Sequence, residues 1–86
     1  MVAAEAVQQW LVTRVSELTG IPPHEVDVEA PIERAGLDSI QMLVLTADLE
    51  NWLGFRFRGD PLDEFPTIAA LARFVAAQGR EGRSRN

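Results

Sequence analysis

The chain has no cysteine and only one histidine, His24, among its 86 residues. It can therefore form neither disulfide bonds nor a zinc finger, and it has no thiol nucleophile. Lysine is also absent, so all eight basic residues are arginines, three of them in the last seven positions. Residues 1–79 hold 12 acids against five bases. This acidic body repels phosphates, so no nucleic acid is expected as a partner.

Long apolar runs are missing as well. No apolar stretch approaches the length of a membrane span, and the first residues lack the basic start and apolar segment of a signal peptide. We therefore expect no membrane association and a cytoplasmic location. A chain of 86 residues forms one small domain that buries roughly 60% of its unfolded surface. So little volume remains for a substrate pocket that the length favours a module on which other proteins act over an enzyme.

A first helix is predicted from four apolar residues that share one face at spacings of four, four and three: Val7, Leu11, Val15 and Leu18. Gly20 and the pair Pro22-Pro23 end it. Arg14 falls on the same face, so we expect its stem to lie along the core edge with the charge in water.

A connection of 19 residues, 20–38, follows, with Val26, Val28 and Ile32 as expected anchors to the core. A structureless connection of this length is uncommon in a small domain unless it is functional. Its carboxylates do not have the spacing of a calcium-binding loop, so they predict a solvated loop and no metal site. These residues are Glu25, Asp27, Glu29, Glu33 and Asp38.

The second helix is predicted to begin at Asp38-Ser39, two residues that favour helix N-caps, and to end at Leu53 before Gly54. Its apolar residues form two stripes. The stripe expected to face the core comprises Met42, Leu45, Leu49, Trp52 and Leu53. The other comprises Ile40, Leu43 and Ala47, bordered by Val44 and Glu50. Because nothing inside so small a domain is left to cover the second stripe, it is a candidate surface for a partner.

The remaining chain predicts a short extended segment over 55–58, where Phe and Arg alternate, and a brief helix after Asp60-Pro61. Thr67 caps a last helix, whose core positions are Ile68, Leu71, Ala72 and Val75. The expected fold is all-α: a small four-helix bundle of three main helices and one short helix, with a long first loop. Residues 1–78 form the domain, and the polar residues 79–86 read as a flexible tail or linker.

The sequence does not support catalysis by the chain itself. Ser39 could serve a hydrolase only if His24 activated it, and nothing marks a third residue to orient that histidine. No catalytic residue is predicted.

The segment Gly36-Leu37-Asp38-Ser39-Ile40 combines a glycine turn, an apolar anchor and two capping residues, which alone is typical of a helix start. In register with the rest of the chain, it resembles the phosphopantetheine attachment motif of acyl carrier proteins, Gly-x-Asp-Ser followed by Leu or Ile. The resemblance covers roughly residues 7–77. The matching segments are 18–23, 35–40, 43–54 and 65–72.

The resemblance implies that Ser39 is esterified by 4′-phosphopantetheine, which a separate phosphopantetheinyl transferase supplies from coenzyme A. The thiol of this arm would hold acyl intermediates as thioesters and present them to ketosynthase, acyltransferase or other synthase domains. The isolated domain would be a monomer without catalytic activity. Gly36, Leu37, Asp38 and Ile40 would complete the attachment motif.

The same resemblance assigns the outer stripe to partner enzymes, through Ile40, Leu43, Val44, Ala47 and Glu50, with charge from Asp38 and Glu50. Val44 and Asn51 stand where fatty acid synthase carriers usually have acids. Ala35-Gly36-Leu37 differs from the Gly-Gly of many peptidyl carriers. These departures favour a polyketide synthase carrier domain. The alternatives are a peptidyl carrier domain of a nonribosomal peptide synthetase and a non-carrier helical interaction module, in which Ser39 is only a cap.

Overall fold

Four α-helices make up the fold in the computed structural model, which describes residues 3–84. They are α1 (Ala4–Thr19), α2 (Ser39–Leu53), the short α3 (Pro61–Glu64) and α4 (Ile68–Ser84). Two 3₁₀ turns, η1 (Pro23–Glu25) and η2 (Ile32–Ala35), lie in the first connection. Within residues 3–84 there is no strand, only one isolated bridge between Pro31 and Thr67. The predicted all-α fold of three long helices and one short helix is confirmed.

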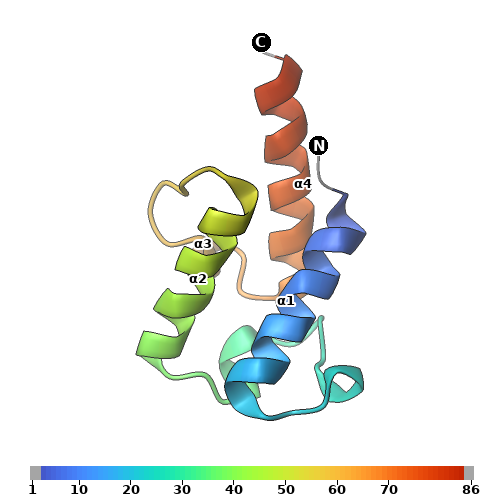
Figure 1. Cartoon of the computed structure of the whole chain (residues 1–86), viewed down its shortest axis with the longest axis vertical. Helices are drawn as coiled ribbons and strands as arrows, with labels where there is room; N and C mark the ends of the chain where they lie inside the picture. The colour runs from blue at the N-terminus through green and yellow to red at the C-terminus, as the bar shows by residue number, and fades with distance from the viewer. Residues whose placement is uncertain (1–2, 85–86) are drawn as a thin grey trace.

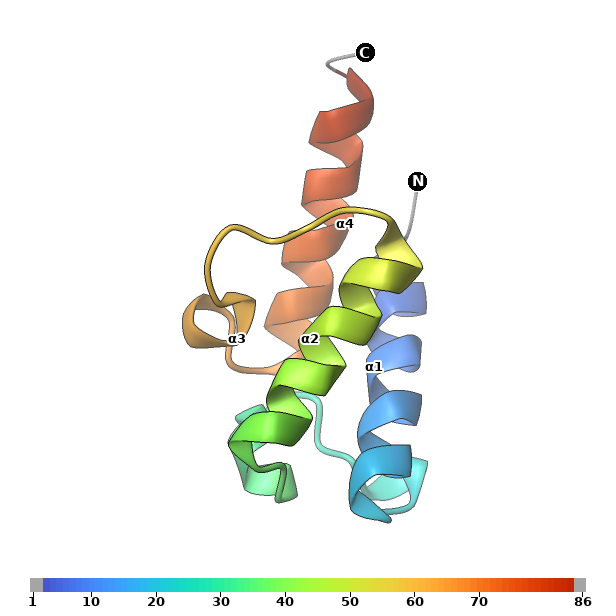
Figure 2. The same cartoon turned by 60° about the vertical axis from the view of Figure 1, so that its left-hand side comes forward.

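The helices run up and down. In Figures 1 and 2, α1 is antiparallel to both α2 and α4, so the beginning of α2 lies at the same end of the molecule as the end of α1. As predicted, α1 ends at Gly20, whose φ of 81° is left-handed and whose N–H donates to the carbonyl of Ser16 at 2.8 Å.

One apolar core lies between the long helices, the 3₁₀ turn η2 and Leu37, which stands two residues before α2. All members predicted for α4 and two predicted for α2 are buried in it, together with the predicted anchor Ile32. Its fully enclosed side chains include Val7, Leu11, Val15, Leu45, Leu49, Ile68, Leu71 and Val75. Met42 and Leu53 are half-buried against it. The periodicity of the sequence therefore located the core correctly.

The long first connection is fastened to the start of α4. The N–H of Ile32 donates to the carbonyl of Pro66 at 2.8 Å, and the N–H of Ala69 donates to the carbonyl of Val28 at 3.0 Å. Thr67 caps α4 as predicted, since its Oγ1 accepts the N–H of Ala70 at 3.1 Å. These bonds fasten the 19-residue connection, whose regular elements are the short turns η1 and η2, to the beginning of α4.

Side chains on α1 and α2 meet along a seam. The indole rings of Trp10 and Trp52 stack with centroids 5.2 Å apart, so Trp52, placed on the core stripe by its spacing, lies at the edge of the core and is 44% exposed. Arg14 is only partly in water: it forms ion pairs with Asp48 of α2 and Glu17 of α1. Because the sequence does not show which helix α1 faces, the bond to Asp48 was not foreseen.

The end of the chain differs from the expectation. The backbone of residues 79–84 continues α4 as a helix, where the sequence predicted a flexible tail or linker. Extending an existing helix adds one hydrogen bond for each residue fixed, and no proline interrupts it. Residues 85 and 86 of the predicted tail lie outside the described residues, as do residues 1 and 2. The division into a domain of residues 1–78 and a tail stays a prediction.

Candidate functional site

The motif of residues 36–40 forms the turn that leads into α2. Gly36 ends η2 with a φ of 95°, and its N–H donates to the carbonyl of Glu33 at 3.2 Å. A side chain rarely adopts this left-handed conformation, which explains the glycine. Leu37 is buried in the core and anchors the turn, whereas the next three residues are all exposed. The five consecutive residues therefore have different surroundings, with Leu37 in the core and Asp38, Ser39 and Ile40 at the surface.

Asp38 and Gln41 close the beginning of α2 with a capping box. The Asp38 carboxylate accepts the N–H of Gln41 at 2.7 Å, and the Gln41 amide oxygen accepts the N–H of Asp38 at 3.1 Å. Of the four N–H groups that a helix N-terminus leaves without an intrahelical acceptor, the box satisfies two. Those of Ser39 and Ile40 are the other two, and they lie where an anion would be stabilised by the helix dipole.

Gln41 has a further role that the sequence reasoning missed. Its side-chain N–H also donates to the carbonyl of Leu18, 3.1 Å away in the last turn of α1. The spacing Asp-x-x-Gln is a readable signal for a capping box. The partner on α1 has no signal in the sequence, because it depends on how the two helices approach.

Ser39 is the first residue of α2 and is exposed at the rim of a shallow groove between α2 and α3. The groove has a volume of about 280 Å³. It is lined by Ser39, Met42, Leu43, Thr46, Asp60 and Leu62. Nothing in the sequence pairs α3 with Ser39, because twenty residues lie between Ser39 and Asp60, the N-cap of α3.

The outer stripe of α2 is uncovered within the described residues. Ile40 is 72% exposed and Leu43 is 70% exposed, while Val44 and Ala47 are also exposed. We call these four residues the α2 strip. The predicted exposure of the outer stripe is thus confirmed. The strip begins at Ile40, directly after Ser39.

Glu50 has a different position from the one expected. Its side chain is half-buried, and its carboxylate accepts the N–H of Phe57 at 2.7 Å. The residue thus fastens the α2–α3 loop to α2. The role predicted from the resemblance, a charge offered to partners, is not tested by this contact.

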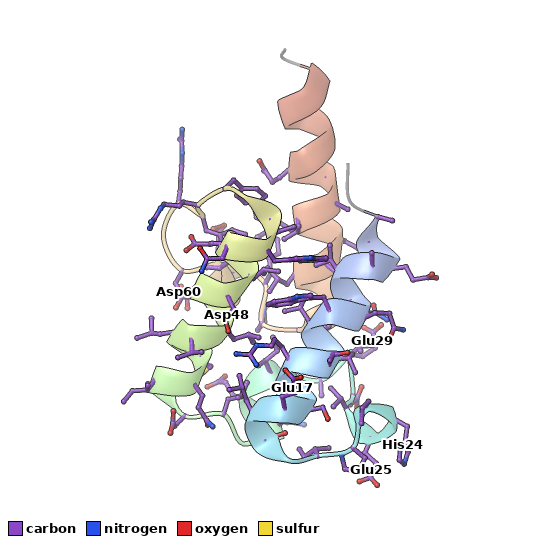
Figure 3. The ribbon with its side chains drawn as sticks, in the orientation of Figure 1. Glu17, His24, Glu25, Glu29, Asp48 and Asp60 are labelled. Carbon is purple, nitrogen blue, oxygen red and sulfur yellow. The ribbon has the colours of Figure 1, made fainter. Side chains whose placement is uncertain are left out.

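The other candidate groups stay apart from Ser39. His24 is exposed in η1, with Nε2 3.6 Å from the carboxylate of Glu25, and does not line the groove at Ser39. Asp48 is held by Arg14 between α2 and α1, close to Glu17 (Figure 3). These hydrogen bonds, first that of Asp48 and then that of Glu17, raise the pKa of Arg14 above its ordinary value.

Two further features are absent from the part of the chain that the structure describes. No group of three or more histidine, aspartate or glutamate side chains there is arranged to hold a metal ion. None of the described helices has the length and apolar character needed to cross a membrane.

Comparison with known proteins gives consistent matches. The model of the family described as "Phosphopantetheine attachment site" matches residues 9–75. The acyl carrier protein TtuC of Teredinibacter turnerae is 34% identical over 77 residues, which are 90% of this chain and 88% of that protein. A segment of the highly reducing polyketide synthase cla2 of Cladosporium cladosporioides is 32% identical over 75 residues, 87% of this chain but 3% of that enzyme.

Among solved structures, a free-standing peptidyl carrier protein from an Acinetobacter baumannii secondary metabolic pathway superposes with a TM-score of 0.81. The match has 26% sequence identity and covers 88% of this chain and 95% of that one.

Proposed function

Because the chain belongs to the family of phosphopantetheine-binding carrier domains, we propose that Ser39 is the serine to which its 4′-phosphopantetheine is attached. Members of this family are carriers and not enzymes, and they hold the group covalently on a serine. The observation that carries the assignment is the position of Ser39. It is exposed at the first residue of a 15-residue helix, inside the segment that matches the family.

The surroundings of Ser39 fit such a group. The N–H groups of Ser39 and Ile40 have no acceptor within the helix, and the positive end of the helix dipole favours a phosphate at this point. The groove beside Ser39 is open, with Met42, Leu43 and Leu62 offering apolar surface to an arm that leaves the serine. When attached, the arm supplies a terminal thiol that forms thioesters.

The residues of the chain itself have simpler tasks. Leu37 and the capping box hold the backbone on both sides of Ser39, so the hydroxyl stays at the rim where a transferase can reach it. Among the residues that the structure describes, the one histidine, His24, does not line the groove at Ser39. In this proposal the phosphopantetheinyl transferase activates the hydroxyl, and Ser39 is its substrate.

We assign the carrier to polyketide synthesis, with ketosynthase and acyltransferase domains as partners and the α2 strip as their docking surface. Two relatives support this assignment, one named an acyl carrier protein and one a polyketide synthase. The second candidate is a peptidyl carrier, and the structural similarity to a peptidyl carrier protein favours it. Fold cannot separate the two because both use the same small bundle.

Attachment is tested by incubating the purified protein with coenzyme A and a broad-specificity phosphopantetheinyl transferase, followed by intact mass measurement. We expect one phosphopantetheine per chain in the native protein and in Ser16→Ala, which removes a serine on α1. Ser39→Ala should stay unmodified while keeping its helical circular dichroism. No mass gain in the native protein, or a gain that survives Ser39→Ala, would refute the assignment and favour a non-carrier interaction module.

The carried group is tested on the loaded protein. Acylation by a malonyl-specific acyltransferase, with no aminoacylation by a stand-alone adenylation domain, is expected for a polyketide carrier. The opposite pattern would replace it with the peptidyl carrier.

A further inference from the structure

A single side chain, that of Gln41, caps the ends of two helices. Its amide oxygen accepts the N–H of Asp38 at the beginning of α2, and its amide nitrogen donates to the carbonyl of Leu18 in the last turn of α1, each at 3.1 Å. The carbonyl of Leu18 has no donor within α1, because the residue four positions later is Pro22, which lacks an N–H. The amide therefore satisfies a free N–H at one helix end and a free carbonyl at the other.

The chemistry of residue 41 is specific. The two contacts need a donor and an acceptor on one long side chain. Glutamine offers both, whereas ionised glutamate only accepts and lysine and arginine only donate. The side chain of Gln41 is half-buried, so a substitution that removes either contact leaves a backbone group with poor access to water and no partner.

Ser39 lies between two anchors. Two residues before it, Leu37 is buried in the core, and two residues after it, Gln41 is bonded to α1. Among the described residues, the bond from Gln41 to Leu18 is the one hydrogen bond between the first turn of α2 and another element. Ser39 itself and its neighbour Asp38 are exposed. Beyond Leu37, the position of the serine relative to the bundle therefore depends on that bond.

The end of α1 that accepts this bond is itself well held. The N–H of Gly20 donates to the carbonyl of Ser16 at 2.8 Å. The Thr19 hydroxyl donates to the carbonyl of Val15 at 2.8 Å and accepts the N–H of Ile21 at 3.2 Å. Because these bonds fix its last turn, α1 provides a firm point of attachment for α2.

We propose that Gln41 is the positioning residue of the attachment site, because its bond to α1 keeps the turn in the conformation that the phosphopantetheinyl transferase binds. This inference rests on the proposed function. In loading, the hydroxyl oxygen of Ser39 forms a bond to the phosphorus that carries the arm of coenzyme A. The bond from that phosphorus to adenosine 3′,5′-bisphosphate breaks, and the hydroxyl proton passes to a base of the transferase.

Gln41 takes no part in these steps. It raises the fraction of protein whose turn is ready to bind, and the apparent affinity of the transferase scales with that fraction. Once bound, the turn has the same conformation with or without Gln41. Loss of its contacts should therefore raise the KM for the carrier and leave kcat unchanged.

The test measures the rate of loading of the full chain at saturating coenzyme A, at a temperature where circular dichroism shows every variant folded. Gln41→Met removes both contacts of the amide, and Gln41→Glu removes only the bond to Leu18. Each should raise KM roughly twofold to fivefold, up to the factor that one net hydrogen bond represents. Val75→Ala, which removes methyl groups from the core on α4, lowers stability away from the turn and should leave KM and kcat unchanged.

Amide hydrogen exchange gives a readout that does not need the transferase. The N–H groups of residues 41 and 42 bond to Asp38. They should exchange faster in both Gln41 variants than in the native protein, and at the native rate in Val75→Ala.

Four results would overturn the proposal. The first is a native KM in both Gln41 variants, and the second is an equal rise of KM in Val75→Ala, which would make the role merely structural. The third is a higher KM with unchanged exchange, since Gln41 would then contact the transferase itself. The fourth is a lower kcat at native KM. If the native protein is loaded on Ser39 and one of these results appears, this inference fails and the proposed function stands.

Discussion

Gln41 joins the attachment turn to α1, and replacing it with glutamate tests that connection. The substitution Gln41→Glu keeps an oxygen that can accept the N–H of Asp38, so the capping box survives. It removes the amide N–H that donates to the carbonyl of Leu18. It also places a carboxylate near the C-terminal end of α1, where the helix dipole is negative.

The expected cost follows from these two changes. One hydrogen bond contributes about 1 kcal/mol net. The new charge is unfavourable at the end of α1 but favourable in the first turn of α2, each by about 0.3–1 kcal/mol, so the two dipole effects offset each other. The free energy of unfolding should therefore fall by about 1 kcal/mol. The loss is measured by urea denaturation followed by circular dichroism, with an unchanged dependence on urea concentration if the native state is intact.

A matched control is Gln9→Glu, the same substitution at an exposed position on α1. It should change the free energy of unfolding by no more than about 0.5 kcal/mol. If Gln41→Glu is as stable as this control, the bond between the two helices contributes nothing and our account of how the turn is held is wrong. Loading of Ser39 should still reach completion in both variants, because the serine stays exposed.

Three further predictions concern stability, each measured by the same urea denaturation. Leu49→Ala removes an enclosed core side chain and should cost about 2–5 kcal/mol; a loss below 1 kcal/mol would contradict the described core. In Gly36→Ala the added Cβ has no other atom within 4 Å, but the alanine is forced to a φ of 95°. It should therefore cost about 1 kcal/mol, and a neutral result would argue against the left-handed turn. In a double-mutant cycle of Arg14→Met and Asp48→Asn, we expect a coupling of about 0.5–1 kcal/mol that shrinks in high salt. A coupling indistinguishable from zero would exclude the ion pair as a stabilising contact.

The elements could be predicted because their signals are local. Gly20 and Gly54 end α1 and α2 where the sequence places the ends, since glycine reaches the left-handed conformation without strain. Asp38 begins α2 for an equally local reason, the hydrogen bond that its carboxylate makes to Gln41. The polar composition of residues 79–84 carries no comparable local stop signal, and their backbone continues α4; the division of the chain into a domain and a tail stays a prediction.

In the candidate site, too, some features could be predicted from the sequence and others could not. The exposure of Ser39 and of the α2 strip could be predicted, since a helix with two apolar stripes in a domain of this size has only one core to face. The contacts of Glu50 and Gln41 could not be predicted, because each side chain binds a backbone group of another segment. Glu50 accepts the N–H of Phe57, and Gln41 donates to the carbonyl of Leu18.

By itself, the sequence determined the helices, the core positions and the place of Ser39 at a helix start, because periodicity and capping act within a few residues. It also determined the absence of cysteine, which leaves the working thiol to an attached group. Only the tertiary structure decided that Asp48 faces Arg14, that Asp60 lines the same groove as Ser39 and that Glu50 binds the N–H of Phe57. Contacts between separate elements depend on how the helices pack in space, which signals within a few residues do not specify.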